Sequence, residues 1–215
     1  ASMSCNPAVG GVAKGQIVRE IDALGGMMGR ITDLSTIQFR MLNRSKGAAM
    51  WSPRAQCDKA LFSRLWRRTL ENTPNLYLWQ DSVVELLFDT DGDRRRVRGV
   101  KTRMGVEIEA RRVVLTAGTF LRGMMHCGDA SAEGGRAGDQ AAYGISEQLQ
   151  ELGFELGRMK TGTPARLDAR TINFEALEIQ EGDEKPSKFS YDTDTEEVKN
   201  QLPCFMVYTS KRVHD

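Results

Sequence analysis

Apolar residues between positions 16 and 24 recur with the period of an amphipathic helix. Ile17, Val18, Ile21 and Leu24 share one stripe, which indicates a half-buried helix over 16–24. The adjacent glycines Gly25-Gly26 predict its end. Apolar and polar residues then alternate over 37–42, which is typical of a strand, and the polar run 43–47 predicts a turn after it.

A second helix is predicted after residue 51. Ser52-Pro53 reads as an N-cap followed by the first helical residue, and the helical spacing of apolar positions continues to about Glu71. Cys57 falls on the apolar stripe of this helix, so we expect a core thiol there. Asn72-Thr73-Pro74-Asn75 predicts the end of the helix.

Residues 76–120 change to short apolar runs that predict strands. The strand candidates are Leu76–Trp79, Val83–Phe88, Val97–Arg103, Val106–Ala110 and Val113–Ala117. Turn signals at 91–93 and 104–105 separate the central three, so we predict a β-meander that returns to a buried strand. The small residues after that strand let a flat ligand approach the carboxyl edge of a parallel sheet. An ordinary buried strand followed by a turn explains the same residues.

The remainder of the chain alternates polar loops with short elements. We predict a glycine-rich loop over 123–138, a helix over 140–152 that Gly153 ends, a short strand over 154–158 and a tight loop over 159–164. Residues 168–203 are acidic and polar, and predict an exposed insertion whose least ordered part is 181–186. The apolar run 204–209 predicts a further strand.

Composition narrows the function classes. The 215 residues fit one large domain or two small ones. Because 30 basic against 29 acidic residues give a net charge of +1, the net charge argues for no partner, and any nucleic-acid surface must be a local patch. Four cysteines without C-x-x-C spacing and two histidines argue against zinc and favour a reduced, cytoplasmic setting. No apolar run approaches the ~20 residues of a membrane span. Because the chain opens on a loop and closes just after a strand, either the fold starts there or this is a piece of a longer protein.

The loop 4–11 is the main candidate for chemistry. Gly10-Gly11 lack Cβ atoms and permit positive φ, so peptide N–H groups at the following helix N-terminus can hold an anionic or carbonyl-rich ligand. Cys5 lies at the edge of that loop, where peptide dipoles favour the reactive thiolate. A glycine turn beside an inert cysteine explains the spacing equally well.

Clusters of arginine are the second candidate. Arg94, Arg95, Arg96 and Arg98 lie on the predicted hairpin, where a solvated turn is favoured over a phosphate contact. Arg64, Arg67 and Arg68 on the predicted helix, with Lys46 and Arg54 on flanking loops, would track an RNA backbone if they shared one face.

Long runs of the sequence resemble the glucose-inhibited division protein A (GidA/MnmG) family. The matching runs are MSCNPAVGGVAKG at 3–15, REIDALGG at 19–26, IQFRMLNRSKG at 37–47, SPRAQ at 52–56, GTFLRG at 118–123, GGRAGD at 134–139 and RMKTGTPARLDARTINF at 158–174. They span most of the chain. Ala48 and Ala165 stand where family members commonly have proline.

The resemblance implies an α/β fold: a Rossmann-like FAD-binding domain of the glutathione-reductase-like type, lacking its first βαβ unit, with a β-meander and a small inserted subdomain. It implies a partial FAD-binding domain over 1–165, with the meander at about 76–117. The beginning of an inserted substrate- or NAD-associated subdomain would follow over 166–215. The chain is similar to an internal portion of such proteins.

The resemblance also implies the site. Cys5 would be one of the family's two functional cysteines, and the residues near the cofactor would be Ser4, Asn6, Pro7, Gly10, Gly11, Val83, Thr116, Ala117, Gly118, Thr119, Lys160, Thr161, Gly162 and Thr163. Val83 would meet the adenine end of FAD, and the turn 160–164 would border the isoalloxazine ring.

The implied reaction adds a carboxymethylaminomethyl or aminomethyl group to carbon 5 of the tRNA wobble uridine. FAD would be the cofactor, NADH and methylenetetrahydrofolate the co-substrates, and a GTPase and a second copy of the chain the partners. Cys5 would add to carbon 6 of uracil; a structural or redox role for it stays open. The alternatives are a folate- and FAD-dependent tRNA uridine methyltransferase, a generic flavoprotein oxidoreductase, and a fragment that is inactive by itself.

Overall fold

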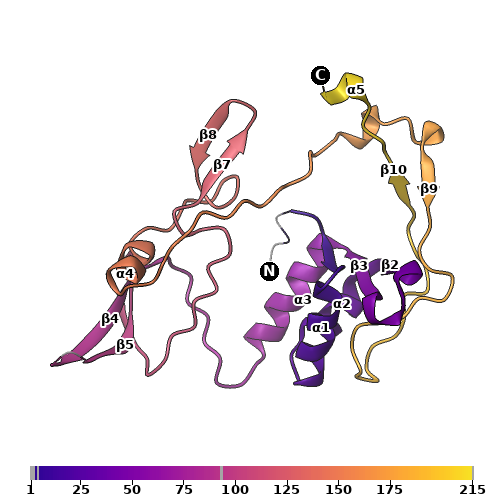
Figure 1. Ribbon diagram of the computed structural model, residues 1–215. Helices are drawn as coiled ribbons and strands as arrows, with labels where there is room; N and C mark the ends of the chain where they lie inside the picture. The colour runs from indigo at the N-terminus through magenta and orange to yellow at the C-terminus, as the bar shows by residue number, and fades with distance from the viewer. Residues whose placement is uncertain (1–2, 4, 93, 215) are drawn as a thin grey trace. The chain divides into compact units, whose positions relative to one another are not determined.

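The computed structural model describes residues 3, 5–92 and 94–214, and the chain forms a mixed α/β structure (Figure 1). It divides into two compact units: residues 1–77 with 162–215 form the first, and 78–161 the second. The functional division at residue 165 that the resemblance implies stays a prediction.

The first unit is built on a three-stranded antiparallel sheet. Its strands are β1 (Ala8–Gly10), β2 (Thr36–Leu42) and β3 (Ser52–Cys57), in the order β1-β3-β2. Three helices accompany it, namely α1 (Lys14–Ala23), α2 (Met28–Ser35) and α3 (Lys59–Glu71), with two short 3₁₀ turns at Arg44–Lys46 and Ala48–Met50. The predicted first helix and the strand over 37–42 are therefore confirmed, and Gly25 ends α1 at φ +84°.

One row of the sheet forms the centre of the core. Val9, Ala55 and Phe39 are register partners on β1, β3 and β2. They pack with side chains from all three helices, and the buried cluster comprises Val9, Val18, Ile31, Phe39, Ala55, Cys57, Phe62 and Phe189. Burial of such apolar surface is the main stabilising contribution in a unit of this size.

The predicted start of the second helix at Ser52-Pro53 is wrong. Ser52–Cys57 forms β3, the central strand, and α3 begins only at Lys59. The Asp58 carboxylate accepts hydrogen bonds from Ala60 N and Leu61 N, both at 2.9 Å, and so caps the helix. Cys57 is buried as predicted, but at the end of the strand, and burial raises the pKa of its thiol to about 11.

Residues 181–202 lie along the free edge of β2 and do not form the wholly exposed insertion that we predicted. Asp183 N donates to Phe39 O at 2.9 Å, Leu202 N donates to Ile37 O at 2.8 Å, and Gln201 Oε1 accepts from Phe39 N at 2.7 Å. An edge strand carries backbone groups that need partners, and this segment supplies them.

The same segment contributes Phe189 to the core. Its ring is 1% exposed and meets Phe39 edge-on, with the ring centroids 6.1 Å apart. The Asp33 carboxylate accepts from Phe189 N at 2.7 Å and Ser190 N at 2.8 Å, and burial raises the pKa of that carboxyl. The polar composition of residues 181–202 is therefore compatible with partial burial, because the segment places Phe189 in the core.

The end of the first unit is a small hairpin. Beyond 3₁₀ turns at Ala169–Thr171 and Phe174–Ala176, β9 (Glu178–Gln180) pairs antiparallel with β10 (Cys204–Met206), and α5 (Lys211–His214) follows. The strand predicted at 204–209 is confirmed over its first three residues. The Gln38 side chain links this hairpin to β2, because its Nε2 donates to Gln180 O and Leu202 O, at 3.0 and 3.1 Å.

The second unit contains the predicted meander. β4 (Val83–Asp91), β5 (Arg94–Thr102) and β6 (Glu107–Glu109) form an antiparallel sheet in the order β4-β5-β6. The helix α4 (Ile145–Glu151) lies along β4, because the Gln148 side chain accepts from Leu86 N at 2.6 Å and donates to Leu86 O at 3.1 Å. α4 is shorter than the predicted helix over 140–152, and Gly144, with φ +96°, precedes its first residue.

Three predicted strands are absent from the second unit and its entrance. Leu76–Trp79, Val113–Ala117 and Phe154–Arg158 have no regular structure, and Tyr77 and Val114 are 89% and 84% exposed. A strand needs a neighbouring backbone, and none of the described strands pairs with these segments. The predicted loop 123–138 instead contains a hairpin of β7 (Met124–Cys127) and β8 (Ala130–Glu133), which turns at Gly128 with φ +57°.

Candidate functional site

The loop around Cys5 is tied to a segment far away in the sequence. The Cys5 thiol donates a hydrogen bond to Gly162 O at 3.1 Å across 157 positions, and the Arg166 guanidinium donates to Cys5 O. Both partners belong to the first unit. The structure thus brings together Cys5 and Gly162, two residues that the resemblance assigned to one site; their roles stay predictions. Ser4 lies outside the described residues.

The Cys5 thiol already has a hydrogen-bond acceptor, because the carbonyl oxygen of Gly162 accepts from its S–H. The thiolate that we expected from the loop's dipoles stays a prediction. The side chain is half-buried, so a substrate or base has partial access to the sulfur.

The rest of the loop is fixed by the sheet. Ala8 N donates to Asn6 O, and Cys57 N donates to Pro7 O, both at 2.7 Å, so the Asn6-Pro7 turn is anchored to the end of β3. A Cβ on Gly10 would lie 2.2 Å from Pro53 O, whereas nothing lies within 4 Å of a Cβ on Gly11. Packing thus requires glycine at position 10, while Gly11 leaves open space for a ligand beside its backbone.

The other predicted residues lie mostly in the second unit. Val83 begins β4 and is the register partner of Thr102. Residues 116–119 form an exposed turn in which Gly118 has φ +57° and Thr119 Oγ1 donates to Gly135 O at 2.7 Å. Lys160 and Thr161 are exposed without regular structure, as is Thr163 in the first unit. Whether the Cys5 loop and the residues of the second unit share one site stays a prediction.

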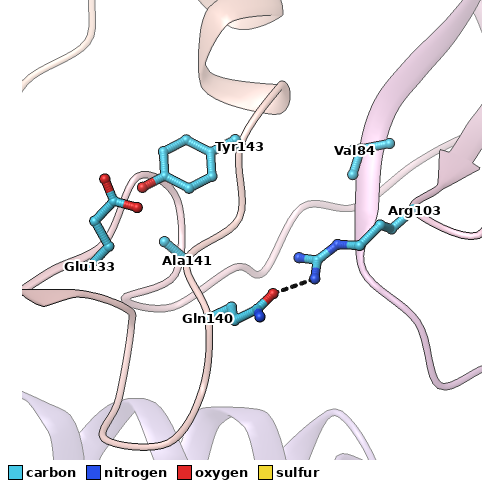
Figure 2. Close-up of a pocket in the computed structure, with 6 residues that line it drawn as sticks. All are labelled: Val84, Arg103, Glu133, Gln140, Ala141 and Tyr143. Atoms are coloured by element: carbon cyan, nitrogen blue, oxygen red, sulfur yellow. Dashed lines mark hydrogen bonds between the residues drawn. The ribbon is translucent and has the colours of Figure 1, made fainter.

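A hollow of about 410 Å³ opens beside Val84, the residue that follows Val83 (Figure 2). Its lining residues come from β4, the turn between β5 and β6, the end of β8 and the segment before α4: Val84, Arg103, Glu133, Gln140, Ala141 and Tyr143. The Arg103 guanidinium donates to Gln140 Oε1 across the hollow. The hydrogen bond of Tyr143 to the Glu133 carboxylate raises the pKa of its hydroxyl.

A second hollow, of about 610 Å³, shares Arg103 and Gln140 with the first. Asp81 and Ser82 also line it, so lining residues stand on both sides of Val83 in the sequence. The hydrogen bond from Thr102 lowers the pKa of the Asp81 carboxyl, and Ser82 N donates to that carboxyl at 2.7 Å. A carboxylate, an amide and a guanidinium next to apolar surface suit a nucleoside.

Sequence reasoning missed most of this lining. Arg103 and Tyr143 stand in no recognisable motif, and only the fold brings the end of β5 to the segment before α4. Gln140 directly follows the GGRAGD run at 134–139, which was a usable signal. Among the described residues, no three His, Cys, Asp or Glu side chains gather as metal ligands, and none of the described helices has the length and hydropathy needed to span a membrane.

Comparison with known proteins decides the family. The family model described as "Glucose inhibited division protein A" matches residues 1–215. The chain belongs to this family. The predicted family and the α/β fold class are therefore confirmed.

GidA relatives match the whole chain at high identity. The "tRNA uridine 5-carboxymethylaminomethyl modification enzyme MnmG" proteins of Cytophaga hutchinsonii and Porphyromonas gingivalis are each 56% identical over 215 residues, which is 100% of this chain and 34% of theirs. Aquifex aeolicus GidA, in its form II crystal, superposes with a TM-score of 0.86 at 47% identity, over 95% of this chain and 34% of that one. The chain thus spans about a third of the length of these relatives.

Proposed function

We propose that this chain is part of an enzyme that modifies the wobble uridine of tRNA at carbon 5, adding a carboxymethylaminomethyl or aminomethyl group. The observation that carries the proposal is the family match over residues 1–215, together with relatives at 56% identity whose name states this modification. Because the chain spans 34% of such a relative, we expect the activity from the full-length protein and not from these 215 residues alone.

FAD is the cofactor that the resemblance implies, and the residues of the second unit fit its adenosine end. The two hollows, whose linings include the sequence neighbours of Val83, offer hydrogen-bonding groups from Asp81, Gln140 and Arg103 as well as the ring of Tyr143. Open space beside Gly11, in the first unit, fits close approach of a flat group to backbone. When bound, FAD would supply redox chemistry for the transferred one-carbon group.

Cys5 is the residue that we assign to the covalent step. Carbon 5 of uracil is not nucleophilic by itself, and a thiolate that adds to carbon 6 makes it so. The Cys5 thiol must first leave Gly162 O and lose its proton, so the segment 162–166 controls when the sulfur is available. The contact between the Cys5 loop and the segment 162–166 would then be the resting state of the nucleophile.

The remaining partners are proposals from the resemblance alone. NADH would supply hydride, methylenetetrahydrofolate the one-carbon unit, and glycine or ammonia the amine. A GTPase and a second copy of the full-length protein would complete the assembly.

Substitution of Cys5 tests the proposal. In full-length protein, Cys5→Ser should reduce tRNA modification at least a thousandfold, measured as modified wobble nucleoside by mass spectrometry after nuclease digestion. Cys127→Ser is the matched control, because Cys127 lies exposed on the β7–β8 hairpin, and it should keep the parent rate. A Cys5→Ser protein that modifies tRNA at the parent rate would remove the nucleophile; a parent protein that modifies no tRNA would remove the function.

A further inference from the structure

Two arginines lie directly opposite each other on the outer face of the first unit's sheet. Arg40 on β2 and Arg54 on β3 are register partners. The neighbouring row, Val9, Ala55 and Phe39, faces the core. Because successive strand residues point to opposite faces, Arg40 and Arg54 project from the other side, with Cβ atoms about 5 Å apart.

This pair of positive charges has no counter-charge within ion-pair distance among the described residues. In the part of the chain that the structure describes, neither arginine side chain forms a hydrogen bond or ion pair. Both side chains are half-buried, and Arg54 Nε is shielded from solvent without an acceptor. The acid that lies along β2, Asp183, is already engaged: its Oδ2 accepts from Met41 N at 2.8 Å and from Arg44 Nη2 at 2.7 Å.

Such an arrangement is unfavourable unless a negative group completes it. Like charges directly opposite each other on neighbouring strands repel. A shielded N–H without an acceptor also loses its hydrogen bonds to water without gaining one in the protein, which costs free energy. A single oxyanion between two guanidinium groups would relieve both effects. Guanidinium presents parallel N–H groups that match two oxygens of one phosphate or carboxylate.

A glycine stands next to the arginine pair. Gly10 is the partner of Arg54 on its other side, so the row reads Gly10, Arg54, Arg40 across the three strands. A Cβ at position 10 would lie 2.7 Å from the Phe189 ring, so that position is filled and the oxyanion would be held by the two arginines alone. Gly11, the next residue, has open space where a Cβ would be.

We propose that Arg40 and Arg54 together bind one oxyanion group, a phosphate or a carboxylate, on the outer face of the β1-β3-β2 sheet. The site requires neither a flavin nor the Cys5 thiol, so it stands independently of the proposed function. Only two guanidinium groups occupy the row, which limits the site to one such group.

Anion binding to the full-length protein tests the proposal, with inorganic phosphate and acetate as probes in a zwitterionic buffer. Calorimetric titration should show saturable binding of at least one probe, and the same probe should raise the thermal unfolding temperature. Arg40→Gln and Arg54→Gln should each weaken the binding at least tenfold. Arg40→Lys, which keeps the charge but loses the fork, should weaken it by less than Arg40→Gln.

A matched control separates this site from charge in general. Arg98 is also a half-buried strand arginine, but it pairs with Glu107 at 3.2 Å, so Arg98→Gln should bind the probe as the parent does. Without anions, Arg40→Gln should unfold at the parent temperature or above, because it removes a like-charge contact. An arginine with a purely structural role would lower that temperature.

The arms of the experiment identify the source of the group. Tighter binding of acetate than of phosphate indicates a carboxylate ligand. If phosphate binds more tightly and undermodified tRNA displaces it, the natural ligand is an RNA phosphate. If tRNA does not displace the bound phosphate, the natural ligand is a small phosphorylated molecule. If neither probe binds, or if Arg40→Gln and Arg54→Gln both bind as Arg98→Gln does, the proposal is wrong. Should Arg54→Gln fail to fold, Arg40→Gln, on the outer strand β2, decides alone.

Discussion

The two units have similar proportions of apolar residues but use them in different ways. In the first, a three-stranded sheet, three helices and the returning segment 181–202 enclose one buried cluster. In the second, the meander has a single hydrophobic residue that is buried, Leu87, while apolar runs such as 113–117 remain exposed. The difference shows that an apolar run becomes a strand only where another backbone pairs with it.

The largest expected difference between the two units is in the stability effect of a phenylalanine-to-alanine substitution. Phe189→Ala should destabilise the chain by about 3–5 kcal/mol, because it leaves a cavity against Phe39 in the first unit's core. Phe154→Ala in the second unit should change stability by less than about 0.5 kcal/mol, because that ring is 59% exposed. Urea unfolding of both variants beside the parent measures the difference; equal losses would contradict it.

A smaller effect follows from the buried thiol of the first unit. Burial holds the pKa of Cys57 at about 11, above the ordinary 9.0, so the folded state binds this proton more tightly than the unfolded state. Its contribution to stability is complete below pH 9 and is lost as the pH rises through 11, up to about 3 kcal/mol.

Two measurements check the Cys57 prediction. The free energy of unfolding of the parent should fall more steeply between pH 9 and 11 than that of Cys57→Ala. At pH 8, iodoacetamide should modify exposed Cys127 at least tenfold faster than Cys57, as mass spectrometry of digested protein would show. Equal labelling of the two thiols would mean that Cys57 is not enclosed.

The smallest effect concerns the attachment of α4 in the second unit. Gln148→Ala removes both side-chain hydrogen bonds to the Leu86 backbone and should cost about 1–2 kcal/mol. Hydrogen exchange at the Leu86 amide should accelerate by about tenfold. Gln150→Ala, on the same helix without such bonds to β4, is the control. If exchange at the Leu86 amide accelerates as much in Gln150→Ala as in Gln148→Ala, the Gln148 side chain does not hold α4 against β4.

Local patterns predicted elements best where partners were close in the sequence. The helix α1 and its end at Gly25 follow from apolar spacing and a glycine, and the β4-β5-β6 meander follows from runs separated by short turns. The prediction failed at Ser52-Pro53, because a Ser-Pro pair can also begin a strand, and here β1 and β2 pair with the residues of β3 on both sides. The helix that follows is capped by Asp58 instead. The apolar run 113–117 likewise predicted a strand that has no partner among the described residues.

The candidate site was predictable as residue types but not as contacts. The run SCNP with paired glycines indicated the Cys5 loop, and the KTGTP run indicated the segment that contains Gly162, yet nothing in either predicted a hydrogen bond across 157 positions. Arg54 entered the sequence reasoning as a loop residue near other basic groups. Only the register of β2 against β3 placed it opposite Arg40.

The sequence by itself determined the family, the α/β class, the local helices and hairpins and the chemistry available at Cys5, because these depend on composition, short-range periodicity and long motif matches. The tertiary structure decided which carbonyl the thiol meets, which carboxylates are buried, that a polar segment closes the sheet edge, and that two arginines share a row. Each of these depends on pairing between distant backbones, and a pairing is a property of two segments that neither carries alone.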